Sequence, residues 1–170
     1  LRISFTGGEP CVHPKFEELV NYCKHKGVKW VNVTTNGTRR PDYYMKLNVD
    51  HIVFSLHFEH DWRKVMTTII KVQKESNKIV MVNVMVHPDH FENAKLCRSR
   101  LMLANVKHTL RRIRWTQGNH DLFDDMRYNP DELEWMLNVE STVNANCVID
   151  DGESYVHAND IIKHKLNNFK

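Results

Sequence analysis

The residues best suited to ligand chemistry stand near the N-terminus, where a short apolar run meets a glycine turn. Residues 4–14 read Ser-Phe-Thr-Gly-Gly-Glu-Pro-Cys-Val-His-Pro. Gly7 and Gly8 let the backbone approach a ligand closely, and the Glu9 carboxylate can hold an amine. Pro10 stiffens the exit from the turn. The turn follows a strand-like run and precedes a helical pattern, which is where α/β proteins bind ligands. The simpler interpretation is an ordinary strand-to-helix turn.

Strand-like and helical segments alternate along the chain after this turn. Strands are expected near residues 2–6, 28–35, 50–57, 78–87 and 109–116. Helices are expected between them, at residues 14–26, 41–47, 62–75 and 88–103. Regular strand–helix alternation implies right-handed βαβ units and a parallel sheet. The sequence therefore predicts an α/β fold.

The predicted strands have one apolar and one polar face. In one of them Ile52, Phe54 and Leu56 alternate with Ser55 and His57. Side chains of a strand point alternately to its two faces, and strands covered by helices on both faces are apolar throughout. Helices on one face and a wet interior on the other are typical of a partly open barrel. The alternative is an α+β sheet with one face in water, which fits less well because a large parallel sheet would be exposed.

The sequence becomes polar and acidic after residue 117, and the regular alternation of strands and helices ends there. We therefore predict a barrel-like domain at 1–117 and a C-terminal segment at 118–170. Asp151-Gly152 is a hairpin turn signal. The segment is expected to contain a polar loop, a helix, a hairpin and a final helix, at residues 118–126, 129–138, 143–157 and 160–167.

Composition excludes several classes of protein. The 170 residues include 24 basic and 21 acidic side chains, a balance that does not indicate nucleic-acid binding. No apolar run approaches the roughly 20 residues that span a bilayer, so no membrane association is expected. The four cysteines, at positions 11, 23, 97 and 147, form no closely spaced set. We therefore expect free thiols and a cytoplasmic protein.

Three motifs resemble those of the radical S-adenosylmethionine enzymes. Residues 7–10, Gly-Gly-Glu-Pro, resemble the GGEP motif of that family, and residues 34–38, Thr-Thr-Asn-Gly-Thr, resemble its TTNG turn. Residues 52–57 resemble the following strand of the family, whose polar residue commonly meets the ribose of the cofactor. The motifs follow one another in the family's order, and the resemblance covers about residues 1–117.

The resemblance implies a partial (β/α)6 barrel in which a four-iron four-sulfur (4Fe-4S) cluster and S-adenosylmethionine bind at the carboxyl ends of the strands. In the family, one electron from the cluster cleaves the sulfonium, and the resulting 5′-deoxyadenosyl radical abstracts a hydrogen atom from the substrate. An electron donor for the cluster is therefore an implied partner. The substrate, a small molecule or a peptide, is not specified by the sequence.

The resemblance also implies roles for individual residues. The methionyl ammonium would be held at the glycine turn, the ribose would meet Ser55, and Asn83 would reach the adenosyl or methionyl group. The residues expected to bind the cofactor are Gly7, Gly8, Glu9, Pro10, Asn36, Ser55 and Asn83. Those expected to face the substrate are His57, Met85, Arg112 and Arg114. The two arginines would favour an anionic substrate.

One departure from the family pattern concerns the cluster. The family's CxxxCxxC loop precedes the GGEP strand, where this sequence begins, and the spacing of the four cysteines does not match that loop. The cluster ligands are therefore expected upstream of residue 1, with no metal ligand in this chain. We expect this chain alone neither to bind the cluster nor to cleave S-adenosylmethionine, and an iron–sulfur absorption band after reconstitution would contradict that expectation.

Two other functions remain open at this point. The chain could be a non-catalytic α/β barrel that binds a ligand and has lost the cluster. It could also be a hydrolase or aldolase barrel that uses His57, His87 and the arginines, with activity independent of iron and reductant.

Overall fold

The structure is a computed structural model that describes residues 1–112, 115–117, 120–122, 128–140, 147–148 and 154–155. Side chains are described at residues 1–111 and 128–136. The chain divides into two compact units, Leu1–Phe123 and Asp124–Lys170.

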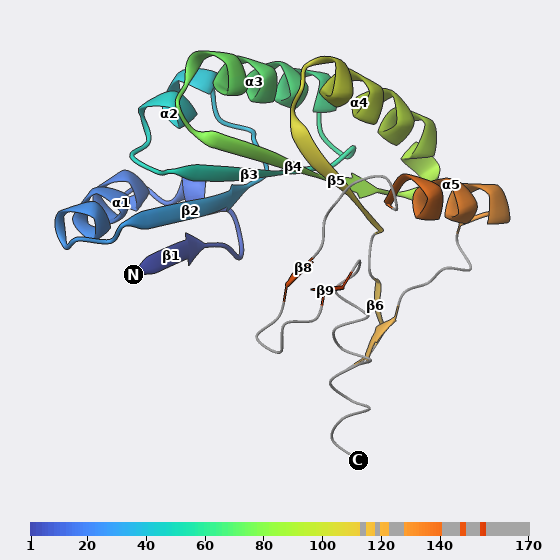
Figure 1. Ribbon diagram of the computed structural model, residues 1–170, viewed down its shortest axis with the longest axis horizontal. Helices are drawn as coiled ribbons and strands as arrows, with labels where there is room; N and C mark the ends of the chain where they lie inside the picture. Colours follow the sequence, from blue (N-terminus) through green and yellow to red (C-terminus); the bar gives the residue numbers. More distant parts are fainter. Residues whose placement is uncertain (113–114, 118–119, 123–127, 141–146, 149–153, 156–170) are drawn as a thin grey trace. The chain divides into compact units, whose positions relative to one another are not determined.

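The first unit is built on a parallel sheet of five strands (Figure 1). Each strand is hydrogen-bonded to its neighbour in the sequence, in the order β1-β2-β3-β4-β5. The strands are β1 Arg2–Phe5, β2 Trp30–Thr35, β3 His51–Leu56, β4 Ile79–Val86 and β5 Lys107–Arg112. Parallel neighbours require a crossover between them, and helices provide it here. The predicted α/β fold with a parallel sheet is therefore confirmed.

Helices connect the strands and cover the sheet. They are α1 Phe16–His25, α2 Pro41–Lys46, α3 Trp62–Glu75 and α4 Phe91–Leu103, with short 3-10 turns η1 Pro10–Val12 and η2 Pro88–His90. In Figure 1, α3 and α4 lie over the same face of the sheet, and they contact β3, β4 and β5. The helix predicted at 62–75 is confirmed at both ends. The Asp61 side chain caps its first turn by accepting from the Lys64 N–H.

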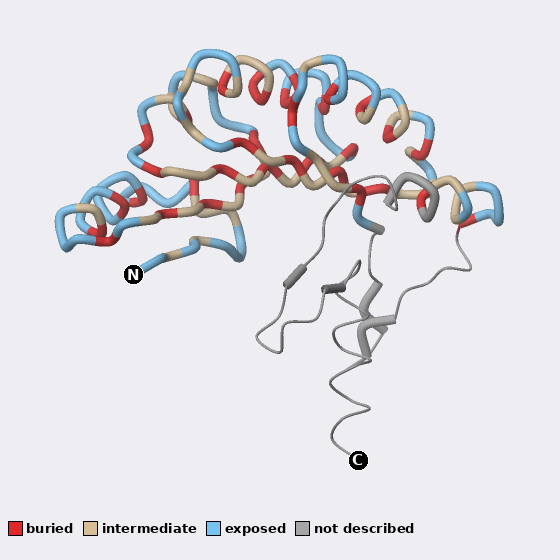
Figure 2. Tube along the Cα trace, viewed as in Figure 1, coloured by how far each residue is buried: buried red, intermediate tan, exposed pale blue. Residues whose placement is uncertain are grey.

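The strands bury one face and leave the other partly open, as Figure 2 shows by the alternation of colours along β2 and β3. Val31 and Val33 of β2 and Ile52 and Phe54 of β3 are fully buried. The intervening residues, such as Ser55, are only half-buried. This confirms the predicted division into an apolar and a polar face for β2, β3 and β4, and the core lies between the sheet and the helices.

The end of the first unit differs from the prediction. A single strand was expected at 109–116, but β5 ends at Arg112, and β6 (Trp115–Gln117) pairs antiparallel with β7 (His120–Leu122). The loop predicted at 118–126 was therefore wrong in part, since it contains β7. The sequence between β6 and β7 is Gly-Asn, which is a two-residue hairpin signal.

The second unit contains helix α5, Pro130–Glu140, close to the predicted helix. Its start is a capping box, in which the Asn129 side chain accepts from the Glu132 N–H and the Glu132 carboxylate accepts from the Asn129 N–H, both at 2.9 Å. β8 (Cys147–Val148) pairs antiparallel with β9 (Ser154–Tyr155), which confirms the predicted hairpin pairing. The final helix predicted at 160–167 lies outside the described residues. Within the described part of the chain, none of the helices combines the length and apolar character that crossing a bilayer requires.

An ion pair fastens α1 to the sheet at the amino ends of the strands. Asp50, which precedes β3, accepts hydrogen bonds from Lys24 Nζ at 2.5 Å and from the Val31 N–H at 2.6 Å. Partial burial raises the pKa of Asp50, but these hydrogen bonds and the Lys24 charge outweigh burial, so the pKa lies below its ordinary value. The ionised carboxylate therefore stabilises the folded state.

We predict that Asp50→Asn lowers the free energy of unfolding by about 1 kcal/mol at neutral pH, because the ion pair with Lys24 is lost. The folded-state pKa is depressed, so the stabilisation is complete above the ordinary aspartate pKa of about 3.9 and disappears as the pH falls through the folded-state pKa. Urea unfolding of both proteins across this range measures the difference. The control is Asp42→Asn, whose side chain is 68% exposed beside Lys71. If Asp50→Asn still lowered the free energy of unfolding relative to the unmodified chain at a pH below the folded-state pKa of Asp50, the prediction would be contradicted.

Candidate functional site

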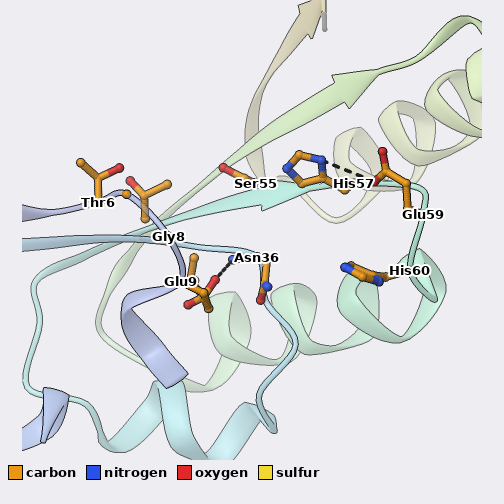
Figure 3. Close-up of a pocket in the computed structure, with 11 residues that line it drawn as sticks. Thr6, Gly8, Glu9, Asn36, Ser55, His57, Glu59 and His60 are labelled. Carbon is orange, nitrogen blue, oxygen red and sulfur yellow. Dashed lines mark hydrogen bonds and ion pairs between the residues drawn. The ribbon is translucent and has the colours of Figure 1, made fainter. Parts of the chain in front are cut away.

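A cavity of about 410 Å³ lies at the carboxyl ends of β1, β2 and β3 (Figure 3). Parallel strands bring the residues that follow them to one edge of the sheet, so three segments distant in the sequence meet there. The residues that line the cavity are Thr6, Gly7, Gly8, Glu9, Thr34, Thr35, Asn36, Ser55, His57, Glu59 and His60.

Two glycines form the wall that follows β1. Gly7 has φ +84° and Gly8 has φ +53°, a backbone conformation that residues with a side chain rarely adopt. A Cβ atom at either position would meet no other atom within 4 Å. The glycines are therefore required by backbone conformation rather than by crowding, and they leave open backbone facing the cavity.

The Glu9 carboxylate ties this turn to the end of β2 through three hydrogen bonds. Oε1 accepts from the Cys11 N–H at 3.0 Å and from Thr35 Oγ1 at 2.8 Å. Oε2 accepts from the Asn36 N–H at 2.6 Å, the contact drawn in Figure 3. A carboxylate has about four acceptor positions, so one position on Oε2 is left for a ligand donor.

The hydrogen bond from Thr35 is the end of a chain that starts in the next loop. Since the Thr35 hydroxyl proton goes to Glu9, the Tyr44 hydroxyl at 3.2 Å must donate to Thr35, and its oxygen accepts from the Arg39 N–H at 3.2 Å. Burial raises the pKa of Tyr44, which keeps its hydroxyl protonated and able to donate. Successive hydrogen bonds in one direction strengthen one another, so this chain fixes the position of Glu9.

The turn after β2 is determined by local contacts. Asn36 Oδ1 accepts from the Thr38 N–H at 3.1 Å and from Thr38 Oγ1 at 2.8 Å. Gly37 has φ +76°, and a Cβ there would lie 2.7 Å from Val65 Cγ1. Both the backbone conformation and the close contact favour glycine at position 37, and the Asn36–Thr38 hydrogen bonds stabilise the turn around it.

Charged residues occupy the side of the cavity that follows β3. His57 Nδ1 lies 3.6 Å from Glu59 Oε2, with His60 beyond them (Figure 3). Phe58, between His57 and Glu59, is buried against Trp62 with ring centroids 5.8 Å apart, and this contact anchors the segment. The lining therefore carries two carboxylates and two imidazoles, and it includes no lysine or arginine from the described residues.

Six residues predicted to bind cofactor or substrate line the cavity, namely Gly7, Gly8, Glu9, Asn36, Ser55 and His57. Asn83 and Met85, both in β4, and Pro10 are not part of the lining. Asn83 is aligned with Ser55 in the sheet, and its Oδ1 accepts a hydrogen bond from Thr109 Oγ1 at 2.8 Å.

The structure does not test the roles of the two predicted substrate-binding arginines. Arg112 is aligned with Val86 of β4, whereas the neighbouring Arg111 is aligned with Met85. The side chain of Arg112, and Arg114 as a whole, lie outside the described residues. In the register of β5, Arg111 thus takes the place beside Met85.

Sequence reasoning missed Thr6, Thr34, Thr35, Glu59 and His60 as lining residues. For the residues after β3 a signal was present. The sequence His57-Phe58-Glu59-His60 follows the strand directly. Its one aromatic residue is buried, and its three polar residues line the cavity. The role of Thr35 had no comparable signal, because it depends on a contact with Glu9 from a distant segment.

The described residues do not supply ligands for an iron–sulfur cluster. Among them no group of three or more histidine, cysteine or acidic side chains is arranged to hold a metal ion. Cys11, Cys23 and Cys97 are buried, and none of these three is among the residues that line the cavity. Burial raises the pKa of both Cys11 and Cys97 to about 12. Both thiols are therefore protonated at neutral pH.

A comparison with protein-family models found no match, and a comparison with curated proteins found none either. The chemistry of the lining residues is therefore what indicates a function.

We predict that Glu9→Ala lowers the free energy of unfolding by about 2–3 kcal/mol, because three donors around a partly buried site lose their acceptor. The control is Glu18→Ala on the exposed face of α1, which should change it by no more than about 0.5 kcal/mol. Chemical denaturation of both variants measures the two values. Equal losses would show that Glu9 does not hold the turn to β2.

Proposed function

We propose that the cavity binds S-adenosylmethionine and that the chain is the core of a radical S-adenosylmethionine enzyme. The observation that carries this proposal is the meeting of three motifs at one cavity. The glycine turn with Glu9, the turn containing Asn36, and Ser55 with its strand come from separate segments, and all three line it. These are the segments whose sequences resemble that family.

The charge of the lining supports a cationic ligand. Glu9 and Glu59 contribute carboxylates, and no lysine or arginine of the described residues lines the cavity. S-adenosylmethionine carries a sulfonium and an ammonium, and nearby carboxylates favour both charges. The free acceptor position of Glu9 Oε2 suits one N–H of the ammonium. An anionic substrate, as the arginines suggested, has no comparable support in this lining.

The size and the walls of the cavity also suit a nucleotide-sized ligand. Its volume of about 410 Å³ lies within the range of small-molecule sites. The open backbone at Gly7 and Gly8 allows the ligand to approach the peptide groups.

We further propose that the sheet is part of a (β/α)6 barrel. Its strands follow one another in sequence order, without the reversal of order that defines a doubly wound sheet. The helix-covered face is apolar and the opposite face is half-buried and polar, which suits the interior of an open barrel.

In this proposal the chain's own residues position the nucleotide. Glu9 would accept from the ammonium, the backbone of the glycine turn would face the methionyl group, and Ser55 would meet the ribose. The iron–sulfur cluster, when bound, supplies the electron that cleaves the sulfonium. The described residues do not fit the cluster, so no step is assigned to it here.

The test is calorimetric titration of the chain with S-adenosylmethionine and with S-adenosylhomocysteine, which lacks the sulfonium charge. We expect S-adenosylmethionine to bind more tightly, because the cavity is lined by carboxylates. Gly7→Ala should weaken binding about tenfold or more, since the new methyl group lies at the wall and the left-handed backbone becomes strained.

The matched control is Gly27→Ala. Gly27 has φ +82° and open space around its Cβ position, almost the same environment as Gly7, but it follows α1 and does not line the cavity. Both variants should lose about 1–2 kcal/mol of stability, and only Gly7→Ala should lose affinity. Absence of S-adenosylmethionine binding by the unmodified chain would overturn the proposal.

A further inference from the structure

The side of the cavity that follows β3 carries a histidine and a carboxylate in contact range. His57 Nδ1 lies 3.6 Å from Glu59 Oε2, and their side chains are 37% and 57% exposed. This distance is that of an ion pair rather than a hydrogen bond, and such contacts at functional sites commonly shorten when a ligand excludes water. In Figure 3 the His57 ring stands between Ser55 and Glu59, with its second nitrogen on the Ser55 side.

The carboxylate determines which nitrogen of the neutral ring holds the proton. A neutral imidazole has one N–H donor and one acceptor, and a carboxylate can only accept. Glu59 therefore favours the proton on Nδ1, which leaves the lone pair on Nε2, the nitrogen on the Ser55 side in Figure 3.

We propose that His57 is a proton-accepting group of the cavity and that Glu59 is its positioning residue. The ligand class is a molecule with a hydroxyl group, bound beside Ser55. In the transfer the ligand O–H bond breaks, its electron pair stays on the oxygen, and a new N–H bond forms at Nε2. The imidazolium that results is neutralised by Glu59. The other titratable groups of the cavity are Glu9, held by three protein donors, and His60.

A second histidine with a carboxylate nearby provides a contrast. His87 Nδ1 lies 3.7 Å from Asp89 Oδ2, but it also accepts a hydrogen bond from the Asp89 N–H at 3.1 Å. Its Nδ1 is therefore an acceptor, and the proton of the neutral ring must sit on Nε2. A histidine with a carboxylate nearby thus favours opposite tautomers at the two positions, and of the two pairs it is His57 with Glu59 that lines the cavity.

The experiment is NMR of the ¹⁵N-labelled chain, in which long-range correlations identify the protonated nitrogen of each neutral ring. We expect His57 to be mainly Nδ1–H and His87 mainly Nε2–H. Glu59→Ala should reverse His57 to mainly Nε2–H, the form that predominates in free histidine. The control Asp89→Ala should change neither ring, since the backbone N–H at position 89 still donates to His87.

Addition of S-adenosylmethionine, whose ribose provides hydroxyl donors, tests the ligand-facing nitrogen. This step rests on the proposed function, and we expect the Nε2 resonance of His57 to move upfield while that of His87 stays in place. If S-adenosylmethionine does not bind in calorimetry, the proposed function is overturned. The role of Glu59 is then decided by the NMR assignment of the His57 tautomer in the unmodified chain and in Glu59→Ala. Three results would overturn the roles given to His57 and Glu59. They are a proton on Nε2 of His57 in the unmodified chain, no change of the His57 tautomer in Glu59→Ala, and binding of the ligand without a shift of the His57 Nε2 resonance.

Discussion

The cavity depends on the carboxylate of Glu9, which links the segment after β1 to the end of β2 through hydrogen bonds. Glu9 stands in the turn after β1, and its donors Thr35 and Asn36 stand at the end of β2. Parallel strands make no direct link between the loops at their carboxyl ends, so this contact is what fixes one loop against the other. The chain of hydrogen bonds from Arg39 through Tyr44 to Thr35 holds the same carboxylate from the far side. The two loops of the cavity wall are thus joined by side-chain hydrogen bonds.

This structural role limits what Glu9 can do for a ligand. Three of its acceptor positions are used by the protein, so it can take one ligand donor and cannot surround an ammonium alone. The open peptide groups at Gly7 and Gly8 and the acidic lining have to supply the remaining interactions. Because positioning and binding depend on the same carboxylate, a substitution of Glu9 alters both.

Much of the fold was predictable because it depends on local periodicity. The alternation of apolar and polar residues in β3 and the capped helix at 62–75 are determined by neighbours in the sequence. The family resemblance, rather than periodicity, assigned the glycine turn, Ser55 and Asn83 to one site. The glycine turn and Ser55 line the cavity, whereas Asn83 is not part of the lining and its Oδ1 accepts a hydrogen bond from Thr109 in the next strand. Contacts of this kind, like that between Thr35 and Glu9, join distant segments and leave no signal in a single sequence.

The most direct measurement is a crystal structure of the chain with S-adenosylmethionine. The account predicts electron density for the nucleotide in the cavity at the ends of β1, β2 and β3, with the ammonium within hydrogen-bond distance of Glu9 Oε2 and the ribose beside Ser55. Density for the ligand at another place, or a cavity that stays free of ligand while Glu9 keeps its three protein donors, would contradict it.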